Sequence, residues 1–83
     1  GISRHIEVKG RYALAETFTV TANEVLEALN QGDKFLLAIV TVDGDVVEAP
    51  VYIRTPFTKE LEAVSANYSL AQYLARGKSA KDV

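Results

Sequence analysis

The 83-residue sequence contains no cysteine, methionine or tryptophan, and it has only two prolines and one histidine. Without cysteine there is neither a disulfide framework nor a thiolate metal site, and a single histidine excludes a histidine-rich site. The lack of cysteine also fits a cytoplasmic protein, and we expect that location.

Long apolar runs are missing as well. No stretch of 18 apolar residues occurs, so we expect no membrane span, and the first residues lack the apolar region of a signal peptide. The chain does not begin with Met, and a strand pattern starts almost at once. We therefore expect residues 1–83 to form a single domain that is a C-terminal fragment of a longer protein.

Basic and acidic residues nearly balance, with 9 Lys and Arg against 11 Asp and Glu. The formal net charge is −2 and 24% of the residues are charged, so the overall field does not indicate a nucleic-acid partner. Three cations nevertheless lie close together near the N-terminus, namely Arg4, Lys9 and Arg11. They are candidates for binding a nucleic-acid phosphate; the alternative is three solvated charges at the end of a strand.

The first half of the chain predicts two strands and a helix. Residues 4–9 alternate as a strand that sends Ile6 and Val8 into a core and His5, Glu7 and Lys9 to the other face, and Gly10 ends it. Residues 17–21 form a second strand with two inward apolar side chains, and the two strands are expected to pair as a hairpin with a wide loop.

A capping box, Thr21 with Glu24, predicts a helix over residues 22–31 that Gly32 terminates. The unbroken apolar run in residues 34–42 predicts a central strand covered on both faces. Asp43 and Gly44 form a hairpin turn into a strand over 46–54, which Pro50 places at an edge or bulge.

A further strand over residues 60–68 and a short helix capped by Ser69 complete the pattern. The predicted order is β-β-α-β-β-β-α, an α/β (α+β) domain with a mixed sheet and few flanking helices.

Glu7 and Lys9 are the residues with the clearest chemistry. A carboxylate holds a hard divalent cation through oxygen, and a neighbouring ammonium positions water or stabilises charge that develops on a phosphate. The Glu-x-Lys spacing points both groups the same way. The alternative is an exposed ion pair worth about 0–1 kcal/mol.

Several segments together resemble the family of the C-terminal domain of the plant protein NO VEIN, which is similar to the PD-(D/E)XK nuclease superfamily. The resemblance covers about residues 4–77. The segments that carry it are Arg4–Arg11, Phe18–Glu24, Gly32–Asp33, Val64–Leu70 and Tyr73–Arg76.

The resemblance implies a restriction-endonuclease-like core with Glu-x-Lys on a central strand. Glu7 would be a catalytic residue and a metal ligand, for Mg²⁺, and Lys9 the catalytic lysine, with Val8 packed into the core between them. An Asp on a preceding strand would complete the site, but that strand would lie before residue 4. Glu24 matches an acidic position of the family.

The function that the resemblance implies is a nuclease-like domain of a helicase- or ATPase-associated protein that acts on or binds DNA. The expected partners are therefore DNA and the helicase or ATPase domains of the parent chain. Two alternatives remain open, namely a catalytically inactive DNA-targeting module and a protein-interaction module.

Overall fold

The computed structural model describes residues 4–83 and contains six strands and two α-helices. They are β1 (His5–Tyr12), β2 (Thr17–Thr21), α1 (Ala22–Gln31), β3 (Phe35–Asp43), β4 (Val46–Val47), β5 (Val51–Arg54), β6 (Ser65–Ser69) and α2 (Leu70–Arg76). Two 3₁₀ turns, Gly32–Lys34 and Ala80–Asp82, follow the helices. The mixed α/β class and the predicted element order are confirmed, with the strand predicted over 46–54 divided into β4 and β5.

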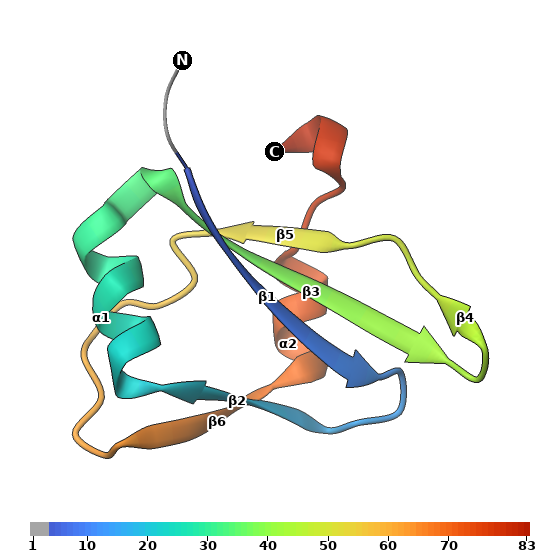
Figure 1. The fold of residues 1–83 in the computed structure, drawn as a ribbon, viewed down its shortest axis with the longest axis horizontal. Helices are drawn as coiled ribbons and strands as arrows, with labels where there is room; N and C mark the ends of the chain where they lie inside the picture. Colours follow the sequence, from blue (N-terminus) through green and yellow to red (C-terminus); the bar gives the residue numbers. More distant parts are fainter. Residues whose placement is uncertain (1–3) are drawn as a thin grey trace.

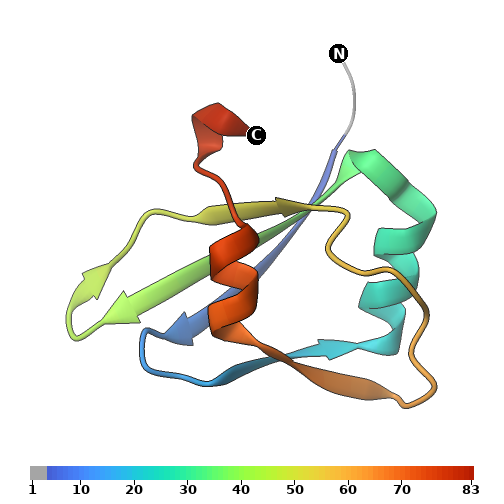
Figure 2. The same ribbon diagram turned by 180° about the vertical axis from the view of Figure 1, so that it is seen from behind.

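Two sheets face each other across the core (Figure 1). In the larger sheet, β3 pairs in parallel with β1 on one side and antiparallel with β4 and β5 on the other. The smaller sheet is the antiparallel pair of β2 and β6. Figure 2 shows α2 lying across the back of the molecule, between the ends of the two sheets.

The predicted hairpin between the first two strands is wrong, because β1 pairs with β3 and β2 pairs with β6. The apolar run of β3 is buried on both faces, which places this strand centrally, and β1 is its neighbour on one side. The first strand is also longer than predicted, since it passes through Gly10 and ends at Tyr12. The predicted strand over 60–68 shortens to Ser65–Ser69.

Local signals explain where the elements begin and end. Thr21 and Glu24 form the predicted capping box of α1, and Gly32 follows the helix with a φ of 58° that favours glycine. Gly44 takes a φ of 61° in the turn between β3 and β4. The break between β4 and β5 includes Pro50, which cannot donate to a ladder.

The core lies between the inner face of the larger sheet, the smaller sheet and the two helices. Its members are all buried apolar side chains: Phe18, Val20, Val25, Ala28, Phe35, Leu37, Ile39, Ile53, Phe57, Leu70 and Tyr73. Most positions of β3 are buried, as predicted for a central strand. The core is therefore built around the inner row of this one strand.

The outer face of the larger sheet is open along β1, although Leu36 and Ala38 on the same face of β3 are buried. Ile6 and Val8 are 50% and 59% exposed, so the expectation that they enter the core, with Val8 as a buried spacer, is wrong. The register explains this result. Ile6 lies beside Leu36, whereas Glu7 lies beside Leu37, and only Leu37 belongs to the inner row. Glu7 and Lys9 therefore point toward the inner side.

Candidate functional site

The inner row of β1 positions the predicted site residues. His5, Glu7 and Lys9 alternate with the exposed outer residues and are partly buried, facing α1. Among residues 4–83, β1 is an edge strand, so the expectation of Glu-x-Lys on a central strand is wrong. The inner side chains of β1 therefore lie at the rim of the core, where charged groups keep contact with water. Glu7 and Lys9 therefore project together, as the Glu-x-Lys spacing predicted, but toward the helix.

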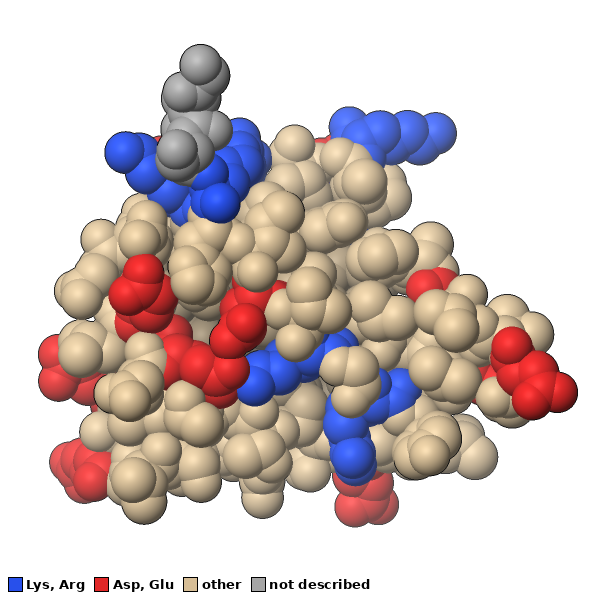
Figure 3. Space-filling view, in the orientation of Figure 1, with Lys and Arg blue, Asp and Glu red and all other residues tan. Residues whose placement is uncertain are grey.

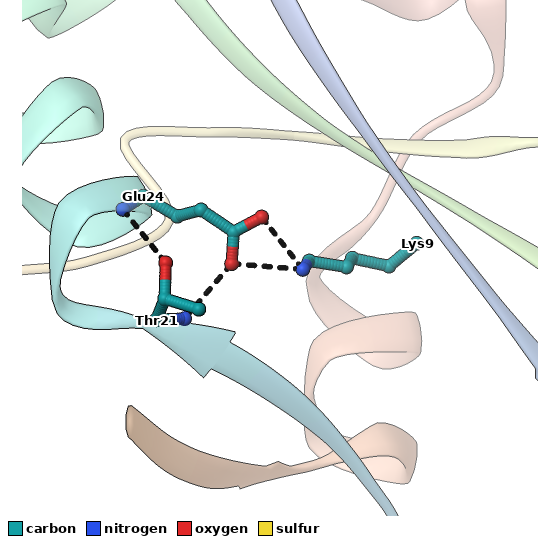
Figure 4. A network of polar contacts seen from close by, with 3 residues as sticks. All are labelled: Lys9, Thr21 and Glu24. Atoms are coloured by element: carbon teal, nitrogen blue, oxygen red, sulfur yellow. Dashed lines mark hydrogen bonds and ion pairs between the residues drawn. The ribbon is translucent and has the colours of Figure 1, made fainter. Parts of the chain in front are cut away.

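The N-terminus of α1 supplies the partner of Lys9 (Figure 4). The Nζ of Lys9 donates to both carboxylate oxygens of Glu24, at 2.8 and 2.7 Å. The same carboxylate accepts a 2.8 Å hydrogen bond from the backbone N–H of Thr21, and the Thr21 hydroxyl accepts from the Glu24 N–H at 3.2 Å. The capping box of α1 thus also holds the lysine of β1.

The two carboxyl groups are coupled. A hydrogen bond to Glu24, together with partial burial and the charge of Glu24, raises the pKa of Glu7 above its ordinary value, against the opposing effect of Lys9. Burial raises the pKa of Glu24, but hydrogen bonds with Glu7, Lys9 and Thr21 outweigh it and lower that pKa to about 2. Glu24 is therefore the carboxylate that stays ionised to lower pH, and Glu7 is the one that takes up a proton more readily.

His5 extends this cluster along α1. Its Nδ1 lies 3.8 Å from an Oε1 of Glu27, one helical turn beyond Glu24, and its ring stacks on Phe35 with centroids 5.0 Å apart. A protonated His5 would pair with Glu27, whereas a neutral one keeps only the stacking contact. The cluster thus alternates acidic and basic groups between β1 and α1.

The three predicted phosphate-binding cations do not form one patch. Lys9 and Arg11 share the inner row and line a hollow of about 250 Å³ between the end of β1 and β2, together with Gly10, Thr17, Phe18 and Thr19. Arg4 belongs to the outer face, where it lines a separate hollow with Ile6 and Leu36. Figure 3 shows acidic side chains gathered over the α1 side and basic ones beside them near the middle of the same face.

Arg11 is fixed at the edge of this hollow. Its Nε donates a 2.9 Å hydrogen bond to the carbonyl of Thr17, which leaves the other guanidinium nitrogens facing solvent or the hollow. Lys9 and Arg11 therefore present two cations at one opening, which is a geometry suited to an anionic group.

The described residues do not complete a Mg²⁺ site. Glu7 offers one carboxylate, but both oxygens of Glu24 already accept hydrogen bonds from Lys9. Within residues 4–83, no group of three acidic or histidine side chains is placed to hold a metal ion. Since Mg²⁺ prefers six oxygen ligands, any cation at Glu7 would need ligands from water or from other groups.

Sequence reasoning missed two parts of this site. The ion pair between Lys9 and Glu24 joins residues 15 positions apart, and the capping role alone explained Glu24 in the local pattern. The resemblance did mark Glu24 as an acidic position, and that was the signal pointing to it. Glu27 was not singled out, although it follows Glu24 by three residues and therefore lies on the same helical face.

These observations define a small mixed α/β domain in which a Glu-x-Lys strand is fastened to a helix N-terminus. A family model described as "Protein NO VEIN, C-terminal" matches residues 1–53, and the chain belongs to this family. No curated protein and no solved structure matches the chain. The family covers β1 to the middle of β5 and thus includes the whole Glu7–Lys9–Glu24 cluster.

Neither of the two helices in residues 4–83 is long and apolar enough to cross a membrane. Among those residues, no buried side-chain nitrogen or oxygen lacks a hydrogen-bond partner.

Proposed function

We propose that this domain acts on or binds DNA as a nuclease-like module similar to the PD-(D/E)XK superfamily, within a longer helicase- or ATPase-associated protein in the cytoplasm. The observation that carries the proposal is the shared placement of Glu7, Lys9 and Arg11 on the inner row of β1, where Lys9 and Arg11 line a hollow. A carboxylate next to two cations is the arrangement expected where a phosphodiester is bound.

Phosphate binding is the part of this function that the described residues support best. The ammonium of Lys9 has three N–H donors and makes two contacts with Glu24, which hold it in place, and Lys9 also lines the hollow. Arg11 adds a second cation at the same opening. Together they would hold the phosphate oxygens, while Glu7 lies beside them as the group that can exchange a proton.

Hydrolysis is a further part of the proposal, with Glu7 as the Mg²⁺ ligand and Lys9 as the catalytic lysine. A bound Mg²⁺ would polarise the phosphate and activate water. Residues 4–83 supply no complete set of ligands. The second and third ligands would therefore have to come from groups outside the described cluster.

The test is DNA binding measured as a function of salt. We expect the 83-residue domain to bind duplex DNA at low salt and to lose affinity as salt rises. Arg11→Gln should reduce the slope of log affinity against log salt by about one, since one phosphate contact is lost. Lys59→Gln, the same charge change at an exposed position on the loop before β6, should leave the slope unchanged.

A domain that does not bind DNA at low salt, or an Arg11→Gln variant that binds as the wild type does, would contradict the proposal. Cleavage is assayed separately with Mg²⁺, and Glu7→Gln and Lys9→Met should each abolish it. Binding without cleavage would favour the inactive DNA-targeting module.

The open outer face favours a second candidate, a protein-interaction module that docks on the helicase or ATPase domains of its parent protein. Large apolar side chains are exposed there, including Tyr12 at 73% and Val47 at 68%. Exposed apolar patches of this kind mark interaction surfaces. Val47→Lys should then weaken binding to the separately produced parent domains without altering DNA binding, and unchanged binding would exclude this surface.

A further inference from the structure

The free edge of β1 is the most accessible backbone surface of the larger sheet. Among the described strands, β1 pairs only with β3, so the N–H and C=O groups along its other side have no strand partner within residues 4–83. The strand is eight residues long and has no proline, two features that leave an edge open to pairing. Its charged residues, which protect many edges, are complementary to those of a second antiparallel copy. The margin of β1 is visible in Figure 1.

The sequence of β1 is self-complementary about Val8. If two copies of this strand are aligned antiparallel with Val8 opposite Val8, Glu7 of each copy stands opposite Lys9 of the other. Opposite charges directly across a strand pair stabilise it, and the two-fold arrangement produces the favourable pair twice. A shift of two residues in one direction places Glu7 opposite Glu7. A shift in the other direction replaces the two pairs by Glu7 with Arg11, but it places Lys9 opposite Lys9.

We propose that β1 pairs antiparallel with β1 of a second copy of this chain, across a two-fold axis at Val8, so that the two larger sheets become one. The occupant of the free edge is thus the same eight-residue strand. This interface would share Glu7 and Lys9 with the proposed DNA site, but a chain that fails to dimerise could still bind DNA, so the two proposals are tested separately.

The inner side of this interface fits the contacts of Lys9. Lys9 makes two hydrogen bonds, both to Glu24, and an ammonium has three donors. The third N–H can therefore meet Glu7 of the second copy without breaking the pair with Glu24. The capping box keeps Lys9 in place before the second strand arrives, which reduces the entropy lost on association.

The outer side of the interface is apolar and has room. Val8 would meet Val8, and Ile6 would stand opposite Gly10 of the second copy. A Cβ built at Gly10 meets no atom within 4 Å, so there is open space above this residue for the side chain of Ile6. Both Ile6 and Val8 are at least half exposed in the single chain, and pairing would cover them.

The test is the oligomeric state of the 83-residue chain by sedimentation equilibrium over a range of concentrations. We expect a reversible dimer. Val8→Lys should raise the dissociation constant at least tenfold, because two like charges would face each other at the two-fold axis. Val47→Lys, the same change at an exposed outer-face position on β4, should leave the dimer intact.

A chain that stays monomeric at every concentration would overturn the proposal. Equal weakening by Val8→Lys and Val47→Lys would also overturn it, since that result would show association through the whole outer face.

A charge reversal tests the register itself. Glu7→Lys should weaken the dimer at least tenfold, because it places like charges opposite each other twice. Adding Lys9→Glu to the same chain should restore the dimer, because both cross-strand pairs then become attractive again. Thermal unfolding verifies that each variant is folded. A folded double variant that stays as weak as the single one would overturn the Val8-centred register.

Discussion

The two faces of the larger sheet differ in what covers them, although the same strands make both. The inner face of β3 carries Phe35, Leu37 and Ile39, all almost fully buried against the helices and the smaller sheet. The outer face leaves Ile6 and Val8 half exposed, although Ala80 and Val83 of the C-terminal segment line a hollow beside Ile6. The same kind of apolar side chain thus serves the core on one face and remains open to contact on the other.

β1 shows the reverse of the usual rule on its own two faces, with charged residues inward and apolar residues outward. The inward row is tolerated because α1 brings Glu24 and Glu27 to meet Lys9 and His5. Charged side chains at the rim of a core are tolerated when oppositely charged groups are already positioned beside them, whereas exposed apolar side chains are common on protein surfaces. The partners on α1 therefore decide which face of β1 turns inward.

Removing a buried ring from the inner row should have the greatest effect on stability. Phe35→Ala, at a fully buried position, should lower the free energy of unfolding by about 3–5 kcal/mol because it leaves a cavity. Val8→Thr on the outer face should change it by less than about 0.5 kcal/mol. Urea unfolding at low protein concentration measures both, and comparable losses would contradict the contrast between the faces.

The next effect concerns the charged row. Lys9→Met keeps the alkyl chain but removes both hydrogen bonds to Glu24, and it should cost about 1.5–3 kcal/mol because these bonds are charge-assisted. Glu24→Gln in the same chain should recover part of the loss, since no unpaired carboxylate then remains. Additive losses in this double-mutant cycle would show that Lys9 and Glu24 do not interact.

Much of the fold followed from local signals in the sequence. The capping box, the glycine after α1, the apolar run of β3 and the turn at Gly44 each depend on residues that are neighbours in the chain. The short second helix and its cap, Ser69, followed in the same way. Such signals act within a few residues, so the order of elements was predictable.

Strand pairing and the orientation of β1 did not follow from the sequence. Alternation in residues 5–9 gives two faces but does not say which one turns inward, and hydrophobicity favoured the wrong choice. The deciding contacts are the parallel register with β3 and the ion pair with α1, which join residues 15 or more positions apart. The site was therefore half predicted: Glu7 and Lys9 were named from their spacing, whereas Glu24 was explained by its cap and was marked as an acidic position by the resemblance alone.

A smaller effect tests whether the cap of α1, unlike the cap of α2, also positions the site residue Lys9. Thr21→Ala should lower the free energy of unfolding by about 0.5–2 kcal/mol through loss of the cap. Ser69→Ala removes the corresponding cap of α2 and serves as the matched control. We expect Thr21→Ala, but not Ser69→Ala, to shift the NMR signal of the Lys9 ammonium. An unchanged signal in both variants would show that the cap of α1 does not position Lys9.

The weakest effect is the pH dependence that the coupled carboxyls impose. The raised pKa of Glu7 means that the folded state holds this proton more tightly than the unfolded state does. The stabilisation that this proton gives to the folded state is fully present below the ordinary pKa of 4.5, and it is lost as pH rises through the raised pKa of Glu7. Glu24 acts in the opposite sense, because its contribution is present above 4.5 and is lost as pH falls toward its pKa of about 2.

Glu7→Gln separates these two contributions on the charged face. The variant should be as stable as the wild type, or more stable, at about pH 7, because the penalty of ionising Glu7 beside Glu24 is gone. Its stability should still fall in acid, since Glu24 remains and loses its charge there. Urea unfolding between about pH 3 and about pH 8 measures the stability near neutral pH and its loss in acid. Both differences from the wild type should be of the size usual for a single surface substitution. A clear loss of stability near neutral pH would mean that Lys9 stabilises ionised Glu7. Both Glu7 and Glu24 would then contribute to holding the charged row of β1 inward.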